Sequence, residues 1–242
     1  MPDAELGEVV DLLRTRFEFS DDGEYSIEVD PRTVGPERIR ALRAMGLNRL
    51  SLGVQDFDPV VQKAINRYQS PEDVGRVTTQ ARSMGYRSIN YDLVYGLPFQ
   101  TLKSVMEAVD EVIRLNPDRI AFYSYAHVPW KHKGQRAYDE SHLPDAELKL
   151  ELFMRGRERL LDAGYEAIGF DHFALPTDSL YQAYRDGTMH RNFMGYTDLR
   201  TKYVIAMGVS SIGDIGSGFC QNVKTVEGYR AKIEKREWPI FK

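Results

Sequence analysis

Short apolar stretches alternate along this chain with longer segments of helical pattern, and this alternation limits the folds that the chain can adopt. The stretches typical of strands lie at residues 24–29, 49–54, 88–94, 120–126, 165–169 and 204–209. Several are nearly continuous apolar runs, which is the pattern of parallel strands covered on both faces. Strands that alternate with helices predict an α/β fold built on a parallel sheet or barrel.

Helix start and stop signals bound the segments between these strands. Ser70 and Pro71 combine an N-cap with a first-turn proline, and Gly85 ends the same segment. Similar signals predict helices at about 36–45, 102–115 and 144–163, and helical patterns also occupy about 4–17 and 225–236.

The two ends of the pattern are expected to be cuts through a larger fold. The helical pattern at 4–17 has no strand before it, and the one at 225–236 leads to no closing element. The sequence therefore predicts that residues 1–242 form one partial parallel (β/α) barrel, TIM-barrel-like and truncated at both ends. A C-terminal extension is expected, and no separate second domain.

Composition and charge narrow the class of protein. The chain is 42% hydrophobic and 28% charged, which is ordinary for a soluble globular protein. Its net charge of −4 argues against a nucleic-acid-binding surface. The first residues lack the pattern of a signal peptide, and no apolar run approaches the roughly 18–20 residues that span a membrane. A single cysteine fits a reducing compartment, so we expect a cytoplasmic protein without nucleic-acid or membrane partners.

Polar residues repeatedly follow the predicted strands. In barrels of parallel strands, reactive groups gather where the strands end, over the barrel mouth. One polar ending means little, because strands often lead into polar turns, but the repetition favours a shared polar mouth. The residues concerned are Glu28, Asp30, Gln55, Asp56, Asp92, Tyr125, Ala126, His127, Asp171 and His172.

Three of the charged residues have two interpretations each. Glu28 lies within an apolar strand, so it is either buried in a pair with Arg49 or free to accept from an amine or a ribose hydroxyl. Asp92 follows the same logic, and Gly96 just after it lets the backbone approach a ligand. Arg67 is either a surface arginine or a bidentate clamp on a carboxylate.

Other chemical motifs are weak or missing. None of the five histidines has the spacing of a metal ligand pair, so no metal site is predicted, and Cys220 has no nearby partner. No dinucleotide fingerprint, P-loop or nucleophile elbow is present. The basic loop at residues 131–136 is either a solvated loop or a receiver of an acidic substrate.

Two phrases carry a resemblance to a known family. IEVDP at residues 27–31 and NRLSLGVQDF at 48–57 resemble the barrel of radical S-adenosylmethionine (SAM) enzymes, specifically oxygen-independent coproporphyrinogen III oxidases. The resemblance continues in family order through residues 66–67, 89–98, 116–119, 125–127, 169–174, 190–193 and 208–212. The phrases DHFA at 171–174 and HRNF at 190–193 favour the oxidase over its haem-chaperone relatives.

The resemblance implies an oxidoreductase of porphyrin and haem biosynthesis. The family converts coproporphyrinogen III to protoporphyrinogen IX by oxidative decarboxylation, using a 5′-deoxyadenosyl radical. It implies two SAM molecules, a [4Fe-4S] iron–sulfur cluster and an electron donor for that cluster; it assigns no catalytic residue here. The residues it assigns to SAM are Glu28 and Ile212 for the first molecule, and Gln55, Arg67, Asp92 and Ala126 for the second.

The sequence also departs from the family. The Cys-x3-Cys-x2-Cys motif that holds the cluster is missing, because Cys220 is the single cysteine. Leu175 and Met194 stand where the family often has Arg and Gln, which weakens any substrate contact assigned there. We therefore expect a central portion of the enzyme that is inactive alone.

Two alternatives remain open at this point. The first is a non-catalytic module, related to the haem chaperone, that binds tetrapyrrole or SAM. The second is an unrelated α/β-barrel enzyme that uses Glu28 and Asp92 as acid and base.

Overall fold

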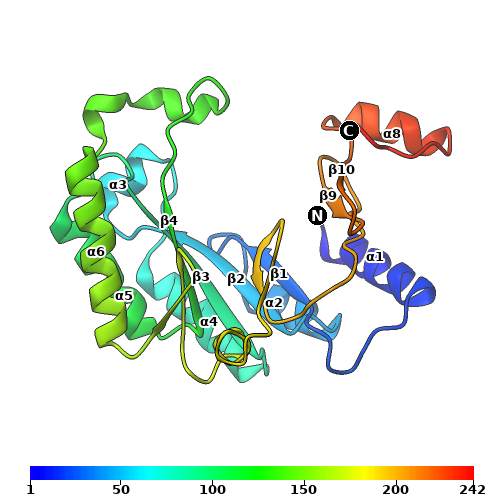
Figure 1. Cartoon of the computed structure of the whole chain (residues 1–242), viewed down its shortest axis with the longest axis horizontal. Coiled ribbons are helices and arrows are strands. Elements are labelled where there is room, and N and C mark those ends of the chain that lie inside the picture. Colours follow the sequence, from blue (N-terminus) through cyan, green and yellow to red (C-terminus); the bar gives the residue numbers. More distant parts are fainter. The chain divides into compact units, whose positions relative to one another are not determined.

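The chain folds into two compact units that are described separately below. The computed structural model describes residues 1–242, and they divide into Met1–Tyr181 and Gln182–Lys242 (Figure 1). The second unit covers the predicted C-terminal extension. The expectation of a single domain stays a prediction. No helix of the structure combines the length and the apolar character needed to cross a membrane.

A six-stranded sheet forms the centre of the first unit, with its strands in the order β1-β2-β3-β4-β6-β5. Four parallel strands follow one another: β1 (Ser26–Val29), β2 (Arg49–Gln55), β3 (Ser88–Tyr95) and β4 (Arg119–Ser124). The predicted α/β fold with a mostly parallel sheet is confirmed. The prediction that residues 165–169 continue it is incomplete. β6 (His172–Ala174) lies between β4 and β5 (Glu166–Ile168) and runs antiparallel to both.

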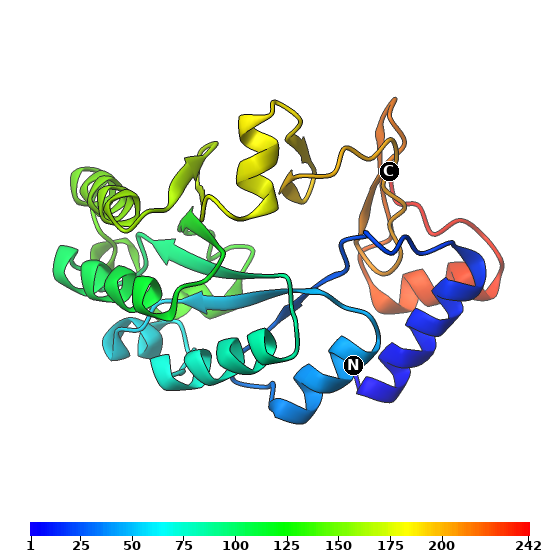
Figure 2. The same ribbon diagram turned by 90° about the horizontal axis from the view of Figure 1, so that it is seen from below.

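Helices cover one face of this sheet (Figures 1 and 2). The helices of the first unit are α1 (Asp3–Arg16), α2 (Pro36–Ala44), α3 (Pro59–Ala64), α4 (Pro71–Ser83), α5 (Leu102–Leu115) and α6 (Ala146–Asp162). Two short 3-10 turns, η1 (Lys133–Ala137) and η2 (Glu140–His142), lie between β4 and α6, and α7 (Ser179–Arg185) begins at the end of this unit.

The sequence signals act as expected at the helix ends. The Ser70 hydroxyl accepts from the backbone N–H of Asp73, which is an N-cap of α4. Thr101 and Ser104 cap the start of α5 reciprocally, and Asn116 ends it in the left-handed conformation at φ 53°.

Side chains alternate between a polar and an apolar face along β1 to β4. Leu52, Tyr91 and Phe122 point to the helix-covered face and are almost fully buried. Their chain neighbours Ser51 and Asn90 belong to the other face. The expectation of continuous apolar strands is therefore wrong: one face packs against helices, and the other carries polar groups.

The apolar core lies between this sheet and the helices. Ile39, Val77, Val109 and Leu152, one from each of α2, α4, α5 and α6, are buried in it. In α6, a Cβ on Gly156 would lie 2.7 Å from the Phe122 ring, so this position needs glycine to let the helix approach β4.

The amino-terminal end of the polar face is filled by buried ion pairs. Arg119 Nε lies 2.5 Å from Asp178 Oδ1, and the other oxygen of Asp178 accepts from the Ser88 hydroxyl at 2.8 Å. Arg49 pairs with Glu24, not with Glu28. These groups satisfy one another, which is the condition under which charges are tolerated in an interior. This end of the face is therefore structural.

The second unit is built from short pieces. β7 (His190–Asn192) pairs with β8 (Gly195–Thr197), β9 (Ile212–Asp214) pairs with β10 (Phe219–Gln221), and α8 (Val226–Glu234) follows. The strand predicted at 204–209 is wrong, because Val204 alone makes an isolated bridge, to Asp214. The apolar residues of this segment lie on irregular backbone. Asn222 holds that backbone, because its side-chain amide donates to the Gly208 carbonyl at 2.9 Å.

Candidate functional site

The polar face of the sheet brings site residues from three strands into neighbouring positions. Glu28 of β1 pairs in register with Ser51 of β2, and Ser51 pairs with Asn90 of β3. One step nearer the carboxyl ends, Gly53 pairs with Asp92. Because parallel strands keep one face in common, these positions form a continuous polar floor.

Asp92 is held within this floor by its neighbours. The Asn90 side-chain amide donates to Asp92 Oδ1 at 2.8 Å and to the Ser51 hydroxyl at 3.0 Å. Burial raises the pKa of Asp92 to about 6, and the nearby Glu28 carboxylate adds to the increase. The charged form of Asp92 is therefore costly without a bound cation or donor.

Glu28 is exposed, and its side chain makes no hydrogen bond or ion pair within the chain, while its backbone pairs with β2. The expected alternative, a buried pair with Arg49, is wrong because Arg49 pairs with Glu24. An unpaired carboxylate next to a polar floor is an open acceptor for a ligand.

Arg67 lies across β2 rather than on the outer surface. Its Nη2 donates to the Gly53 carbonyl at 2.7 Å and lies 3.7 Å from Asp30 Oδ2. Its Nε is buried without a hydrogen-bond partner, and burial lowers the pKa of the guanidinium. The Asp30 carboxylate is already bound by Arg32, so it meets only part of the bonding capacity of Arg67. The guanidinium therefore retains a donor for a carboxylate ligand.

Gly53 makes room for this arginine. A Cβ built on Gly53 would lie 2.7 Å from Arg67 Nη2 and 3.0 Å from the Gln55 amide nitrogen. Both side chains therefore close over the bare backbone of Gly53.

Gln55 ends β2 in a strained conformation. Its φ is 67°, in the left-handed region, and the register between β2 and β3 shifts between Gly53 and Gln55. Such a conformation costs a non-glycine residue about 1–3 kcal/mol and is common at ligand sites. The strain redirects the chain at the point where β2 meets the loop that carries Arg67.

The predicted residues after β4 lie in a loop, since the strand ends at Ser124. Ala126 is exposed, and its carbonyl accepts from the Gln135 amide at 3.2 Å. The Tyr125 hydroxyl lies 2.5 Å from that of Tyr138, and burial together with this contact raises the pKa of Tyr125. Lys149 of α6 donates to the Tyr125 carbonyl at 2.7 Å, so the backbone of this loop is fixed.

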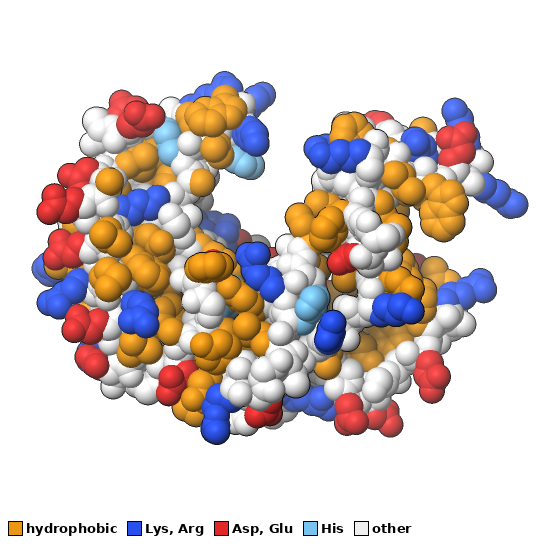
Figure 3. Space-filling view, in the orientation of Figure 1, with side chains coloured by type: hydrophobic (Ala, Val, Ile, Leu, Met, Phe, Trp, Pro, Cys, Tyr) orange, Lys and Arg blue, Asp and Glu red, His pale blue; other side chains and the backbone are white.

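Cationic side chains gather over the same loop (Figure 3). Lys131, His132 and Lys133 are exposed and make no ion pair. The two sequence-based interpretations, a solvated loop and a receiver of acidic substrate, both remain open for it.

The remaining predicted residues lie in different parts of the structure. His172 and Asp171 are hydrogen-bonded at 2.7 Å between Nδ1 and Oδ1, in and beside β6. Asp56 does not face the polar floor, because it is only 1% exposed and its Oδ2 accepts from the Gln100 amide of another loop at 2.6 Å. Ile212 belongs to β9 of the second unit, and its role stays a prediction.

Sequence reasoning missed three residues of the floor: Ser51, Gly53 and Asn90. Their signal was strict alternation within β2 and β3, where every second residue is polar or glycine. Because apolar layers were expected on both faces of these strands, this alternation was not recognised in the sequence.

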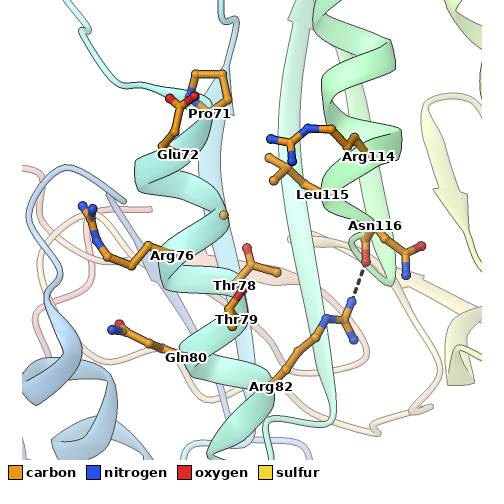
Figure 4. A pocket seen from close by; sticks show the side chains of 11 residues that line it. Pro71, Glu72, Arg76, Thr78, Thr79, Gln80, Arg82, Arg114, Leu115 and Asn116 are labelled. Carbon is orange, nitrogen blue, oxygen red and sulfur yellow. Dashed lines mark hydrogen bonds between the residues drawn. The ribbon is translucent and has the colours of Figure 1, made fainter.

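A groove of about 680 Å³ between α4 and α5 lies elsewhere (Figure 4). Its arginines have partners: Arg76 pairs with Asp73, and Arg114 with Glu111. Arg82 donates to the Asn116 carbonyl, before the start of β4. The groove therefore runs along α4 beside the end of α5, among the helices and away from the polar floor.

The comparisons with known proteins define the class first. The family model described as the radical SAM superfamily matches residues 2–112, which include Glu28, Gln55, Arg67 and Asp92. Residues 2–112 therefore match a radical SAM domain, and that family implies SAM and a [4Fe-4S] cluster.

Relatives along nearly the whole chain are oxygen-independent coproporphyrinogen III oxidases. That of Pseudomonas aeruginosa is 45% identical over 238 residues, covering 98% of this chain and 52% of the relative. That of Escherichia coli K12 is 42% identical over 233 residues, covering 96% and 51%. The predicted resemblance is confirmed, and the chain spans about half the length of the curated relatives it matches.

A solved structure shares the fold. The coproporphyrinogen III oxidase of Escherichia coli, described as a radical SAM enzyme, matches with a TM-score of 0.96 at 40% identity. The match covers 100% of this chain and 56% of that one. The partly parallel sheet is therefore the arrangement of that enzyme.

The residues present fit SAM but not the cluster. SAM carries a carboxylate, an ammonium group and ribose hydroxyls, which complement the partly exposed Arg67 guanidinium and the open Glu28 carboxylate. An iron–sulfur cluster needs several thiolates, whereas this chain has one cysteine, and no group of three potential metal ligands is assembled.

Proposed function

We propose that this chain is the SAM-binding barrel portion of an enzyme that oxidatively decarboxylates coproporphyrinogen III in haem biosynthesis. The observation that carries the proposal is the polar floor. There, a buried arginine donor without a partner lies within electrostatic range of two carboxylates, Glu28 and Asp92. The identity to the oxidases supports the substrate assignment.

Each residue of the floor has a separate task. Arg67 takes the carboxylate of SAM through its free donors, and Glu28 and Asp92 accept from its ammonium group or ribose hydroxyls. Asn90 and Ser51 hold the Asp92 carboxylate in place. When bound in a complete radical enzyme, SAM supplies the radical that begins the oxidation.

The finer assignments follow the family resemblance. Two SAM molecules are proposed, and Glu28 is assigned to the first. The second is contacted by Gln55, Arg67, Asp92 and Ala126. An electron donor is the proposed protein partner, in the cytoplasm, without nucleic-acid or membrane binding. Because one cysteine cannot hold the cluster, this chain alone is proposed to bind SAM without cleaving it.

Isothermal titration calorimetry of the chain with SAM tests the proposal. We expect binding that weakens about tenfold or more in Arg67→Ala and in Asp92→Asn, since each removes a charged contact. Arg76→Ala is the matched control, because that arginine is exposed on α4 and pairs only with its helix neighbour Asp73. Absence of binding, or equal affinity in all variants, contradicts the proposal.

The single cysteine also favours a second function, a module that binds tetrapyrrole without catalysis. An absorbance titration with haem separates the two. Haem binding by a chain with no affinity for SAM would establish the module, and SAM binding at the floor supports the enzyme.

A further inference from the structure

Buried side chains outside the polar floor join the loops that follow β2 and β3. Asp56 is 1% exposed and Gln100 is 4% exposed. The Gln100 amide donates to Asp56 Oδ2 at 2.6 Å, and Asp56 Oδ1 accepts from the backbone N–H of Asp58 at 2.6 Å. The carboxylate of one loop is thus bound by the amide of the other.

Gln100 also fixes the turn after β3. Its side-chain oxygen accepts from the N–H groups of Gly96 at 2.6 Å and Leu97 at 2.9 Å. Its nitrogen donates a second time, to the Val94 carbonyl at 2.9 Å. The end of the strand that carries Asp92 is therefore tied through Gln100 to Asp56.

Two more buried amides extend the network to the loop of Arg67. The Gln62 amide of α3 donates to the Asp56 carbonyl at 3.0 Å and to the Gln69 carbonyl at 2.7 Å. The Arg67 N–H donates to the Gln62 carbonyl at 2.9 Å, and the Gln69 amide donates to the Val54 carbonyl. The strained Gln55 lies between Val54 and Asp56, so both of its neighbours are held.

The carboxylate of Asp56 has no cation beside it. The charged group that acts on it is Asp58 of the same loop, while α3 and the segments before α4 and α5 present the amides of Gln62, Gln69 and Gln100. Burial raises the pKa of Asp56 to about 6, so it is ionised at neutral pH at some cost. That cost is offset by charge-assisted hydrogen bonds, which are shorter and stronger than neutral ones.

We propose that Asp56 and Gln100 form a buried clamp that positions Gln55 and Arg67 for SAM. The clamp touches no ligand; it holds the left-handed turn at Gln55 and the spacing between the two loops. This inference rests on the proposed function, because it concerns the same ligand.

Asp56→Asn is the conservative test, since it keeps the shape and removes the charge. At about pH 7.5 we expect SAM to bind about tenfold more weakly, because a charge-assisted bond is lost. The thermal midpoint is expected to fall, because the new amide places an N–H donor where the Asp56 carboxylate accepted from Gln100 or from the N–H of Asp58. Affinity is therefore measured well below that midpoint, on a chain shown by circular dichroism to be folded, which separates positioning from loss of structure.

Exchanging the acid and the amide between positions 56 and 100 tests whether SAM affinity can be rescued. Gln100→Glu alone opposes two carboxylates and is expected to weaken SAM binding strongly. The double variant Asp56→Asn/Gln100→Glu restores one acid and one amide, and affinity is expected to recover in part relative to Gln100→Glu, because the new carboxylate can accept from the new amide but cannot donate to the Val94 carbonyl. If Gln100→Glu does not fold, Asp56→Asn alone decides.

The outcomes are distinguishable from those of the proposed function. A parent chain that binds no SAM overturns the function and the clamp together. A parent that binds SAM and a folded Asp56→Asn chain of equal affinity overturn only the clamp. A double variant that folds but stays as weak as Gln100→Glu also overturns it.

Discussion

A single glycine decides where the arginine of the site can lie. Gly53 belongs to β2, and its missing side chain leaves space that the guanidinium of Arg67 fills while donating to the Gly53 carbonyl. Sequence reasoning identified Arg67 through its resemblance to a family, but not Gly53, because one glycine in a strand has several common explanations. The requirement is visible only when the two residues, far apart in sequence, are placed together.

Gly53→Ala is expected to weaken SAM binding to a similar degree as Arg67→Ala. The added Cβ, 2.7 Å from Arg67 Nη2, forces the end of a flexible side chain to move, while the backbone of β2 is unaffected. Calorimetry measures the affinity, and circular dichroism the fold. Gly134→Ala is the control, because a Cβ there meets nothing within 4 Å. Unchanged affinity in Gly53→Ala would show that the position of Arg67 is not required.

The acidity of Asp92 links ligand binding to pH. Its pKa of about 6, above the ordinary value of 3.8, means that the folded chain holds the proton more tightly than the unfolded chain. Its contribution to stability is therefore complete below about pH 4 and is lost as pH rises through about 6. SAM, which needs the ionised carboxylate as an acceptor, is expected to bind more tightly over the same rise.

Asp92→Asn isolates this contribution. The amide mimics the protonated acid, so we expect stability relative to the parent chain to change on the order of 2 kcal/mol between pH about 4 and about 7. Denaturant unfolding at several pH values measures the difference. Parallel pH profiles for the two chains would contradict the raised pKa.

At the scale of elements, local signals predicted the helices and the parallel strands β1 to β4, but not how the later strands pair. Capping residues such as Ser70 and Thr101 bond to backbone groups only a few residues away, so they can be recognised from the local sequence. The antiparallel insertion of β6 between β4 and β5 depends on contacts remote in sequence. The failed strand at 204–209 has apolar residues without a neighbouring strand to pair with. Periodicity predicts an element, but its partner is a property of the fold.

Packing of α6 on β4 depends on Gly156. Gly156→Ala places a Cβ 2.7 Å from the buried Phe122 ring, so we expect a loss of about 1–3 kcal/mol in unfolding free energy. Gly7→Ala is the helical control, because its Cβ would lie 3.7 Å from the end of Met45, an ordinary contact. There we expect a small gain, from the higher helix propensity of alanine. Denaturant unfolding measures both, and equal effects would contradict the close approach of α6.

At the scale of the whole molecule, the chain carries the polar floor but only one cysteine. Sequence phrases drew attention to Glu28, Gln55, Arg67 and Asp92, which lie within the segment that matches the radical SAM family model. They did not reveal that Asp56 turns inward, because burial depends on Gln100 from another loop. The residues of a site can be read from motifs, whereas the network that supports them requires the fold.

Anaerobic reconstitution with iron and sulfide tests whether this chain can hold the iron–sulfur cluster. We expect no stable [4Fe-4S] absorbance from the 242-residue chain, because four-iron clusters are held by several cysteine thiolates and Cys220 is alone. Cys220→Ser is the matched control and is expected to give the same spectrum, since one thiol adds only adventitious iron. A stable cluster that depends on Cys220 and cleaves added SAM would contradict the assignment of this chain to ligand binding alone. A flat spectrum combined with calorimetric SAM binding would place ligand recognition in the polar floor and radical generation outside these residues.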